Sequence, residues 1–102
     1  MYHRLDTLQK TVGFQWDTGN LEKNWRRHRV TQAECEQVFA NHPVVSVDEG
    51  HSGDELRHYA LGQTGPGRHL TITFTVRNSL VRVISARPMS RREGRVHAEG
   101  QA

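Results

Sequence analysis

The sequence is poor in the features that mark secreted and membrane proteins. Its single cysteine, Cys35, excludes an intrachain disulfide and fits a reducing compartment. The first ten residues, MYHRLDTLQK, lack the apolar segment of a secretory signal peptide. No apolar run approaches the length of a membrane span. We therefore expect a cytoplasmic protein that does not insert into a membrane.

The usual signatures of cofactor and metal sites are also missing. The sequence has no P-loop, no GxGxxG or GxSxG motif and no convincing carboxylate pair. The glycine-rich stretch LGQTGPGR joins two predicted strands and does not open a helix, so it is a loop. The seven histidines are dispersed, without the spacing of zinc ligands. The sequence predicts neither a metal nor a cofactor.

Lysine is scarce, and arginine takes its place. The 102 residues, enough for one domain, include twelve arginines and two lysines, with a net charge of +3. The isoelectric point is about 9.6. The planar guanidinium of arginine binds phosphates and carboxylates through paired hydrogen bonds. This composition indicates a small folded domain with a polyanionic partner.

The N-terminal half predicts an arm, a strand and two helices. Residues 1–12 have little pattern, and GFQW is a short strand candidate. Asp17 offers an N-cap for a helix over TGNLEKNWRRH. Thr31 and Glu34 have capping-box spacing at the start of VTQAECEQVF, and Pro43 ends that second helix.

Helical spacing predicts which side chains of these helices are buried. Leu21, Trp25 and His28 form one stripe, and we expect Trp25 to lie in the core. Trp16 and Trp25 offer the alternative of stacking on nucleic-acid bases. Cys35 is expected to be a small buried residue and not a nucleophile.

The C-terminal half predicts four strands and a short helix. The strands are VVSVD, ELRHYALG, HLTITFTVR and LVRVISAR, and the helix covers about residues 91–98. A two-residue turn at Asn78 and Ser79 would join the last two strands. The opposed pairs are then Val76 with Val81, Phe74 with Val83, Ile72 with Ser85, and Leu70 with Arg87.

These elements predict an α+β fold. Two N-terminal helices pack on a mostly antiparallel four-stranded sheet, and a short helix follows at the C-terminus. We expect an N-terminal arm at residues 1–12, a single domain at 13–98 and a tail at 99–102.

The same register separates the C-terminal arginines. Arg77 and Arg82 fall on the face away from the core, whereas Arg87 falls at the far end of the core side. Ser90 and Glu93 predict a capping box for a helix whose first turn carries three further cations. Because a helix N-terminus is already positive, this crowding favours a bound phosphate or a carboxylate of a partner. The three cations are Arg91, Arg92 and Arg95.

Three stretches in combination, FQWDTGNLEKNWRRHRVTQAEC, ELRHYALG and RVISARPMSRRE, resemble the BrnT family. Members are the toxin halves of bacterial toxin–antitoxin pairs, and the resemblance covers residues 14 to about 97. It implies a RelE-like fold and a metal-independent ribonuclease that uses the 2′-OH of RNA as nucleophile, inhibiting translation and growth. It also implies a BrnA-type antitoxin with a ribbon-helix-helix part, through which alone the toxin would touch promoter DNA.

The resemblance also implies roles for particular residues. Arg57, Arg77 and Arg87 become candidates to stabilise the charge on the phosphate. His51, in a Gly/Ser/Asp loop, is the leading acid or base, since the charge of histidine changes near pH 6.5. The residues expected to bind RNA or the antitoxin are Lys23, His28, Arg82, Arg91, Arg92 and Arg95, with Lys23 and His28 as catalytic reserves.

This chain departs from the family pattern at two positions. Arg29 stands where members commonly carry a glycine after the helix-ending histidine. His97 stands where they commonly have a tyrosine, so it either replaces a polar ring or weakens the activity. The alternative function is therefore a non-catalytic member, acting as an antitoxin-bound co-repressor or an RNA-binding module.

Overall fold

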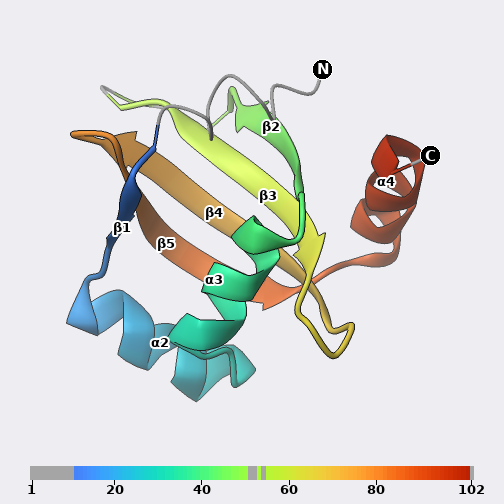
Figure 1. Cartoon of the computed structure of the whole chain (residues 1–102), viewed down its shortest axis with the longest axis horizontal. Coiled ribbons are helices and arrows are strands. Elements are labelled where there is room, and N and C mark those ends of the chain that lie inside the picture. The colour runs from blue at the N-terminus through green and yellow to red at the C-terminus, as the bar shows by residue number, and fades with distance from the viewer. Residues whose placement is uncertain (1–10, 51–52, 54, 102) are drawn as a thin grey trace.

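The chain forms a five-stranded sheet with three helices packed around it (Figure 1). The computed structural model describes residues 11–50, 53 and 55–101, and these counts refer to that part of the chain. The strands are β1 (Gly13–Gln15), β2 (Val44–Asp48), β3 (Arg57–Gln63), β4 (His69–Arg77) and β5 (Leu80–Pro88). The helices are α2 (Thr18–His28), α3 (Gln32–Ala40) and α4 (Arg91–Gln101).

The prediction of a four-stranded, mostly antiparallel sheet is wrong. The strand order is β1-β5-β4-β3-β2, and β1 pairs in parallel with β5, so the sheet is five-stranded and mixed. The GFQW segment does form a strand, but its three residues are too few for alternation to indicate a partner. Its position is set by tertiary packing, because the Phe14 ring meets the Phe39 ring edge-on at 5.5 Å between centroids.

The predicted helix starts are confirmed. Asp17 Oδ1 accepts the backbone N–H of Asn20 at 2.9 Å, and Thr31 and Glu34 form a reciprocal capping box. α4 begins with a second box at Ser90 and runs to Gln101, beyond the predicted end at residue 98. None of the helices in the described ranges is long and apolar enough to cross a membrane.

Arg29 ends α2 in the left-handed conformation, with φ 53° and ψ 43°. Its N–H donates to the Trp25 carbonyl at 2.9 Å. Glycine adopts this conformation without the steric cost that a Cβ carries, which fits the glycine that the resemblance to BrnT proteins implies at this position. Here Arg68 stabilises the turn, because its guanidinium donates to the carbonyls of His28 and Arg29, both at 2.8 Å.

The β4–β5 hairpin follows the predicted register only near its turn. Asn78 and Ser79 have positive φ values of 54° and 62°, as a two-residue hairpin turn requires. The pairs Val76 with Val81 and Phe74 with Val83 are confirmed. A β-bulge then inserts one extra residue into β5 at Ile84, so the pairs beyond it are shifted. Ile72 opposes Ala86 and Leu70 opposes Pro88, which corrects the predicted pairs with Ser85 and Arg87.

α2 runs along the edge of β5 where β1 ends. Its side chains take the place of a neighbouring strand. Asn20 Nδ2 donates to the Val83 carbonyl at 3.3 Å, and Lys23 Nζ donates to the Ile84 carbonyl at 3.2 Å. Asn24 Oδ1 accepts the Ala86 N–H at 3.2 Å. Polar side chains of α2 therefore satisfy the backbone of β5 around the bulge.

The buried side of α2 differs from the predicted stripe. Asn24 is 2% exposed, whereas Trp25 is 49% exposed and His28 is also exposed, so placing Trp25 in the core was wrong. The helix turns its polar residues inward because the edge of β5 needs hydrogen-bond partners. Trp25 instead stacks under the Arg29 guanidinium, 5.0 Å from the ring centroid.

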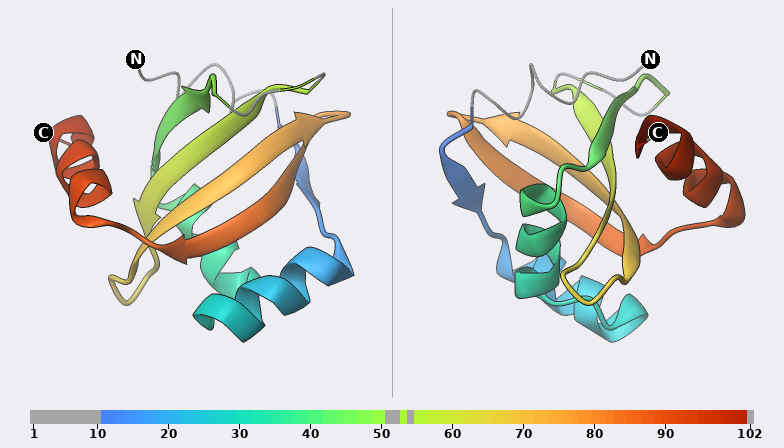
Figure 2. Two further views of the ribbon diagram at one scale, coloured as in Figure 1. Left: turned by 180° about the vertical axis from the view of Figure 1, so that it is seen from behind. Right: turned by 45° about the vertical axis from the view of Figure 1, so that its right-hand side comes forward.

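The core lies on the face of the sheet that α3 covers (Figure 2). Phe74 is fully buried at its centre, in edge-on contact with Phe39 and stacked with His58. Cys35 is 1% exposed, which confirms its predicted burial, and the same burial raises the pKa of its thiol to about 12. The thiolate needed of a nucleophile is therefore disfavoured.

We predict that Asn24→Ala lowers the free energy of unfolding by about 2 kcal/mol, because the buried Ala86 N–H loses its acceptor. Urea unfolding followed by circular dichroism measures this change. Arg26→Ala, on the exposed side of the same helix, is the matched control and should stay within about 0.5 kcal/mol of the unchanged chain. Equal unfolding midpoints for the two variants would contradict the assigned role of Asn24.

Candidate functional site

The second face of the sheet is polar. We call it the polar face. Alternation and register place on it the side chains that point away from α3, since successive residues of a strand face opposite sides. The face includes apolar Val44 and Leu61, which α4 approaches, and Leu80 near the hairpin. Its polar members include Ser46, Asp48, Arg57, Tyr59, His69, Thr71, Thr73, Thr75, Arg77, Arg82, Ser85 and Arg87.

The register arranges the polar face in rows that run across the strands. One row contains Asp48, Arg57, Thr75 and Arg82, and the next contains Ser46, Tyr59, Thr73 and Ser85. The third row contains Val44, Leu61, Thr71 and Arg87. Neighbouring rows lie about 7 Å apart. A middle row of hydroxyl side chains, all small except Tyr59, is therefore flanked by arginines on both sides.

Arg87 lies on the polar face, which corrects its predicted place on the core side. The bulge at Ile84 turns the strand by one residue, so Ala86 enters the core and Arg87 faces outward. Its guanidinium pairs with the Glu93 carboxylate through two hydrogen bonds of 2.7 Å. This pairing raises the pKa of Arg87 and lowers the pKa of Glu93 to about 2.

Glu93 also holds the start of α4. Its Oε1 accepts the Ser90 backbone N–H at 2.8 Å, and the Ser90 hydroxyl accepts the Glu93 N–H at 3.2 Å. The helix lies close to the sheet at its other end as well, because a Cβ on Gly100 would be 2.5 Å from Val44. One carboxylate thus fixes both the helix and the orientation of Arg87.

Tyr59 is a candidate that the sequence did not single out. Burial raises the pKa of its phenol, and a hydrogen bond with the Asp48 carboxylate raises it further, while Arg87 opposes the rise. The phenol therefore stays protonated near neutral pH and can donate a proton. Alternation within RHYALGQ puts Tyr59 on the same face as Arg57, but its approach to Arg87 depends on the register of three strands.

Arg77 and Arg82 lie toward the hairpin end of the polar face, as predicted for the non-core side. Arg77 Nε and an Nη atom pair with the Glu55 carboxylate, both at 3.0 Å, and this contact lowers the pKa of Glu55. Arg77 is about 20 Å from Arg87 along the strands, estimated from the rise per residue. The two arginines share a face but cannot contact one phosphate.

Other predicted residues lie away from the polar face or outside the described ranges. Lys23 binds the Ile84 carbonyl at the edge of β5, and His28 is exposed at the end of α2. His51 lies outside the residues that the structure describes. Arg91, Arg92 and Arg95 are exposed on α4, and Arg92 also lines a cavity between that helix and the sheet.

His97 faces inward from α4 and is 6% exposed. Its ring meets the His69 ring edge-on, with 5.6 Å between centroids. Burial lowers the pKa of His97, and the charge of His69 lowers it further. The neutral imidazole that results packs at the position where the resemblance to BrnT proteins implies a tyrosine.

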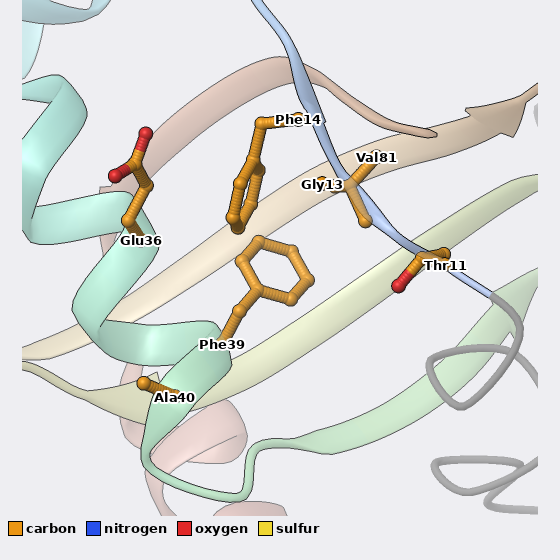
Figure 3. Close-up of a pocket in the computed structure, with 7 residues that line it drawn as sticks. All are labelled: Thr11, Gly13, Phe14, Glu36, Phe39, Ala40 and Val81. Carbon is orange, nitrogen blue, oxygen red and sulfur yellow. The ribbon is translucent and has the colours of Figure 1, made fainter. Parts of the chain in front are cut away.

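A cavity of about 230 Å³ lies on the opposite side of the sheet (Figure 3). The rings of Phe14 and Phe39, which lie next to each other, form part of its wall, with Glu36 at one side and Val81 from β5 at another (Figure 3). It lacks the arginines of the polar face. Among the described residues, no three His, Cys, Asp or Glu side chains come together in a group that could hold a metal ion.

Comparisons with known proteins identify the class first. The crystal structure of the ribonuclease toxin BrnT from Brucella abortus matches this chain with a TM-score of 0.57 at 21% sequence identity. The match covers 79% of this chain and 100% of the Brucella chain, so the two share the fold of a ribonuclease toxin.

The family follows from the sequence model. A family model described as "Ribonuclease toxin, BrnT, of type II toxin-antitoxin system" matches residues 16–93. The chain belongs to the BrnT family, which confirms the resemblance drawn from its motifs. Membership implies an RNA target and an antitoxin partner. None of the curated proteins matches this chain.

We predict that the ion pair of Glu93 makes stability depend on pH in the acid range. The pKa of Glu93 in the folded chain is about 2, below the ordinary glutamate value of 4.5. The pair therefore stabilises the fold fully above about pH 4.5, and the stabilisation is lost as the pH falls toward 2. Because Arg87 is partly exposed, we expect only about 1–2 kcal/mol.

Glu93→Gln should remove this part of the pH dependence. Urea unfolding at a series of pH values between 5 and about 2.5 measures the difference between the two chains. The difference should be largest at pH 5 and shrink as the pH falls. A difference that stays constant over this range would show that the charge of Glu93 does not stabilise the fold.

Proposed function

We propose that this chain is an active, metal-independent endoribonuclease that cleaves single-stranded RNA by attack of the 2′-OH on the adjacent phosphate. The observation that carries the proposal is the middle row of the polar face. There the small side chains of Thr73 and Ser85 leave room between Arg57 and Arg82 on one side and Arg87 on the other. A phosphate over this row would meet guanidinium groups from two directions, an arrangement that stabilises the developing charge.

We assign the catalytic roles from the protonation states that the reaction requires of its acid and its base. Attack by the 2′-oxygen requires a base, and departure of the 5′-oxygen requires a proton. Tyr59 supports the second task, because its raised pKa keeps the phenol protonated and the Asp48 carboxylate holds it in place. His51, which the sequence predicts as the acid or the base, is proposed to act as the base. Arg57 and Arg87 are the proposed phosphate ligands, and Arg77, at the end of the face, is proposed to bind a neighbouring phosphate.

We further propose a BrnA-type ribbon-helix-helix antitoxin as the partner in the cytoplasm, with promoter DNA reached only through it. The cations at the start of α4 support this interface. Arg91, Arg92 and Arg95 are exposed there and suit an acidic surface of a partner protein. Arg82, which lies on the polar face, is also proposed to contact RNA or the antitoxin.

Incubation of the purified chain with RNA in EDTA tests the proposed chemistry. We expect cleavage to persist in EDTA and to give 2′,3′-cyclic phosphate ends, because the RNA supplies the nucleophile. Loss of cleavage on chelation, restored by a divalent cation, would contradict metal independence. Binding of RNA without cleavage would favour the non-catalytic alternative.

We predict that Arg87→Ala lowers kcat/KM for RNA cleavage roughly 100- to 1,000-fold, the usual effect of deleting one donor to a developing charge. The variant also loses the pair with Glu93, so its thermal unfolding is measured beside the kinetics. Arg26→Ala, an exposed arginine of α2 outside the polar face, is the charge-matched control. Unchanged kinetics in a folded Arg87→Ala chain would remove Arg87 from the site.

A further inference from the structure

A cavity of about 350 Å³ opens between α4 and the polar face. Its sheet side is formed by Ser46 from β2 and by Tyr59 and Leu61 from β3. Its helix side is formed by residues of the first turns of α4 and the residue before them. These are Ser90, Arg92, Glu93 and Val96.

The walls of this cavity combine apolar and polar side chains. Leu61 and Val96 belong to opposite sides, and the Tyr59 ring adds an aromatic surface beside them. The hydroxyls of Ser46 and Ser90 and the guanidinium of Arg92 add donors and acceptors. A nucleobase has the matching character, with two apolar ring faces and a polar edge.

The cavity adjoins the proposed phosphate site. Glu93 lines it and also pairs with Arg87 at 2.7 Å. Tyr59 lines it as well, and the charge of Arg87 acts on the pKa of its phenol. Leu61 and Arg87 stand in one cross-strand row, separated by β4. Two strand spacings make about 10 Å between their backbones. A nucleotide with its phosphate at Arg87 would therefore direct its base toward the cavity.

The geometry points to a nucleobase subsite: the cavity between α4 and β3 accepts one base of the RNA next to the phosphate held by Arg87. This inference rests on the proposed ribonuclease function, and it adds a binding position for one base of the RNA substrate. At about 350 Å³ the cavity is at the small end of ligand pockets, which fits one base and not a longer stretch of RNA. α4 thereby becomes part of the substrate site as well as a cap on the sheet.

NMR titration of the purified chain with small ligands tests the subsite without requiring cleavage. The ligands are the four nucleoside monophosphates, as 5′- and 3′-forms, and ribose 5-phosphate as the counterpart without a base. We expect at least one nucleotide to bind roughly tenfold more tightly than ribose 5-phosphate, as stacking of one base contributes. The chemical-shift changes should include Tyr59 and Val96.

Val96→Trp fills the cavity and should reduce nucleotide affinity to that of ribose 5-phosphate, while ribose 5-phosphate binds as before. Ala98→Trp adds the same side chain at an exposed position of α4 and should change neither affinity. Thermal unfolding of both variants checks the fold. Leu61→Ala is a second variant that widens the cavity, and it should also weaken nucleotides selectively.

The proposal is overturned if no nucleotide binds more tightly than ribose 5-phosphate, or if Val96→Trp and Ala98→Trp behave alike. It is also overturned if Val96→Trp leaves nucleotide binding intact and abolishes binding of the antitoxin, since the cavity would then serve a protein partner. Base-dependent binding without RNA cleavage would refute the ribonuclease proposal and leave the subsite standing. Cleavage without base-dependent binding would refute the subsite alone.

Discussion

The bulge at Ile84 is the feature on which the polar face depends. A regular strand would continue the alternation of Val81 and Val83 and would send Arg87 into the core. One inserted residue reverses the alternation, so that Ala86 packs inside and Arg87 emerges beside Tyr59 and Glu93. A bulge leaves backbone groups without ladder partners, and α2 supplies them through Asn20, Lys23 and Asn24. Lys23, which the sequence offered as a catalytic reserve, thus binds the backbone of β5 at the bulge.

The arginines of the polar face are held by carboxylates. Glu93 orients Arg87 with two short hydrogen bonds, and Glu55 orients Arg77. Each pair fixes a long side chain whose guanidinium keeps further N–H donors. In the proposed site an RNA phosphate would therefore bind a guanidinium that is already ordered, and less side-chain entropy would be lost on binding. The same arrangement explains why a strongly basic face is compatible with a stable fold.

The two departures from the family pattern have different physical consequences. Arg29 adopts the left-handed conformation that glycine takes more easily, and Arg68 and Trp25 contact it there. This departure concerns the end of α2 and lies apart from the polar face. His97 fills a buried position of α4 beside His69, where a neutral ring packs well. It affects how α4 lies on the sheet, which bears on the cavity that α4 shares with Tyr59.

The amino-acid sequence by itself determined the local structure and the family. The caps at Asp17, Thr31 and Ser90 are short-range hydrogen bonds, so the helix starts could be read from neighbouring residues. The tight turn at Asn78 and Ser79 set the first pairs of the hairpin for the same reason. The motifs of the BrnT family are contiguous stretches and were recognisable without a fold.

Only the tertiary structure decided what those elements do together. The parallel pairing of β1, the exposure of Trp25 and the inward turn of Asn24 all depend on the edge of β5, which is distant in sequence from α2. The alternation of apolar and polar residues in β5 does not indicate where the bulge lies. The bulge nevertheless determines the face of the sheet on which Arg87 lies. Because side chains of a strand change sides with every residue, a single insertion decided which arginines share the polar face.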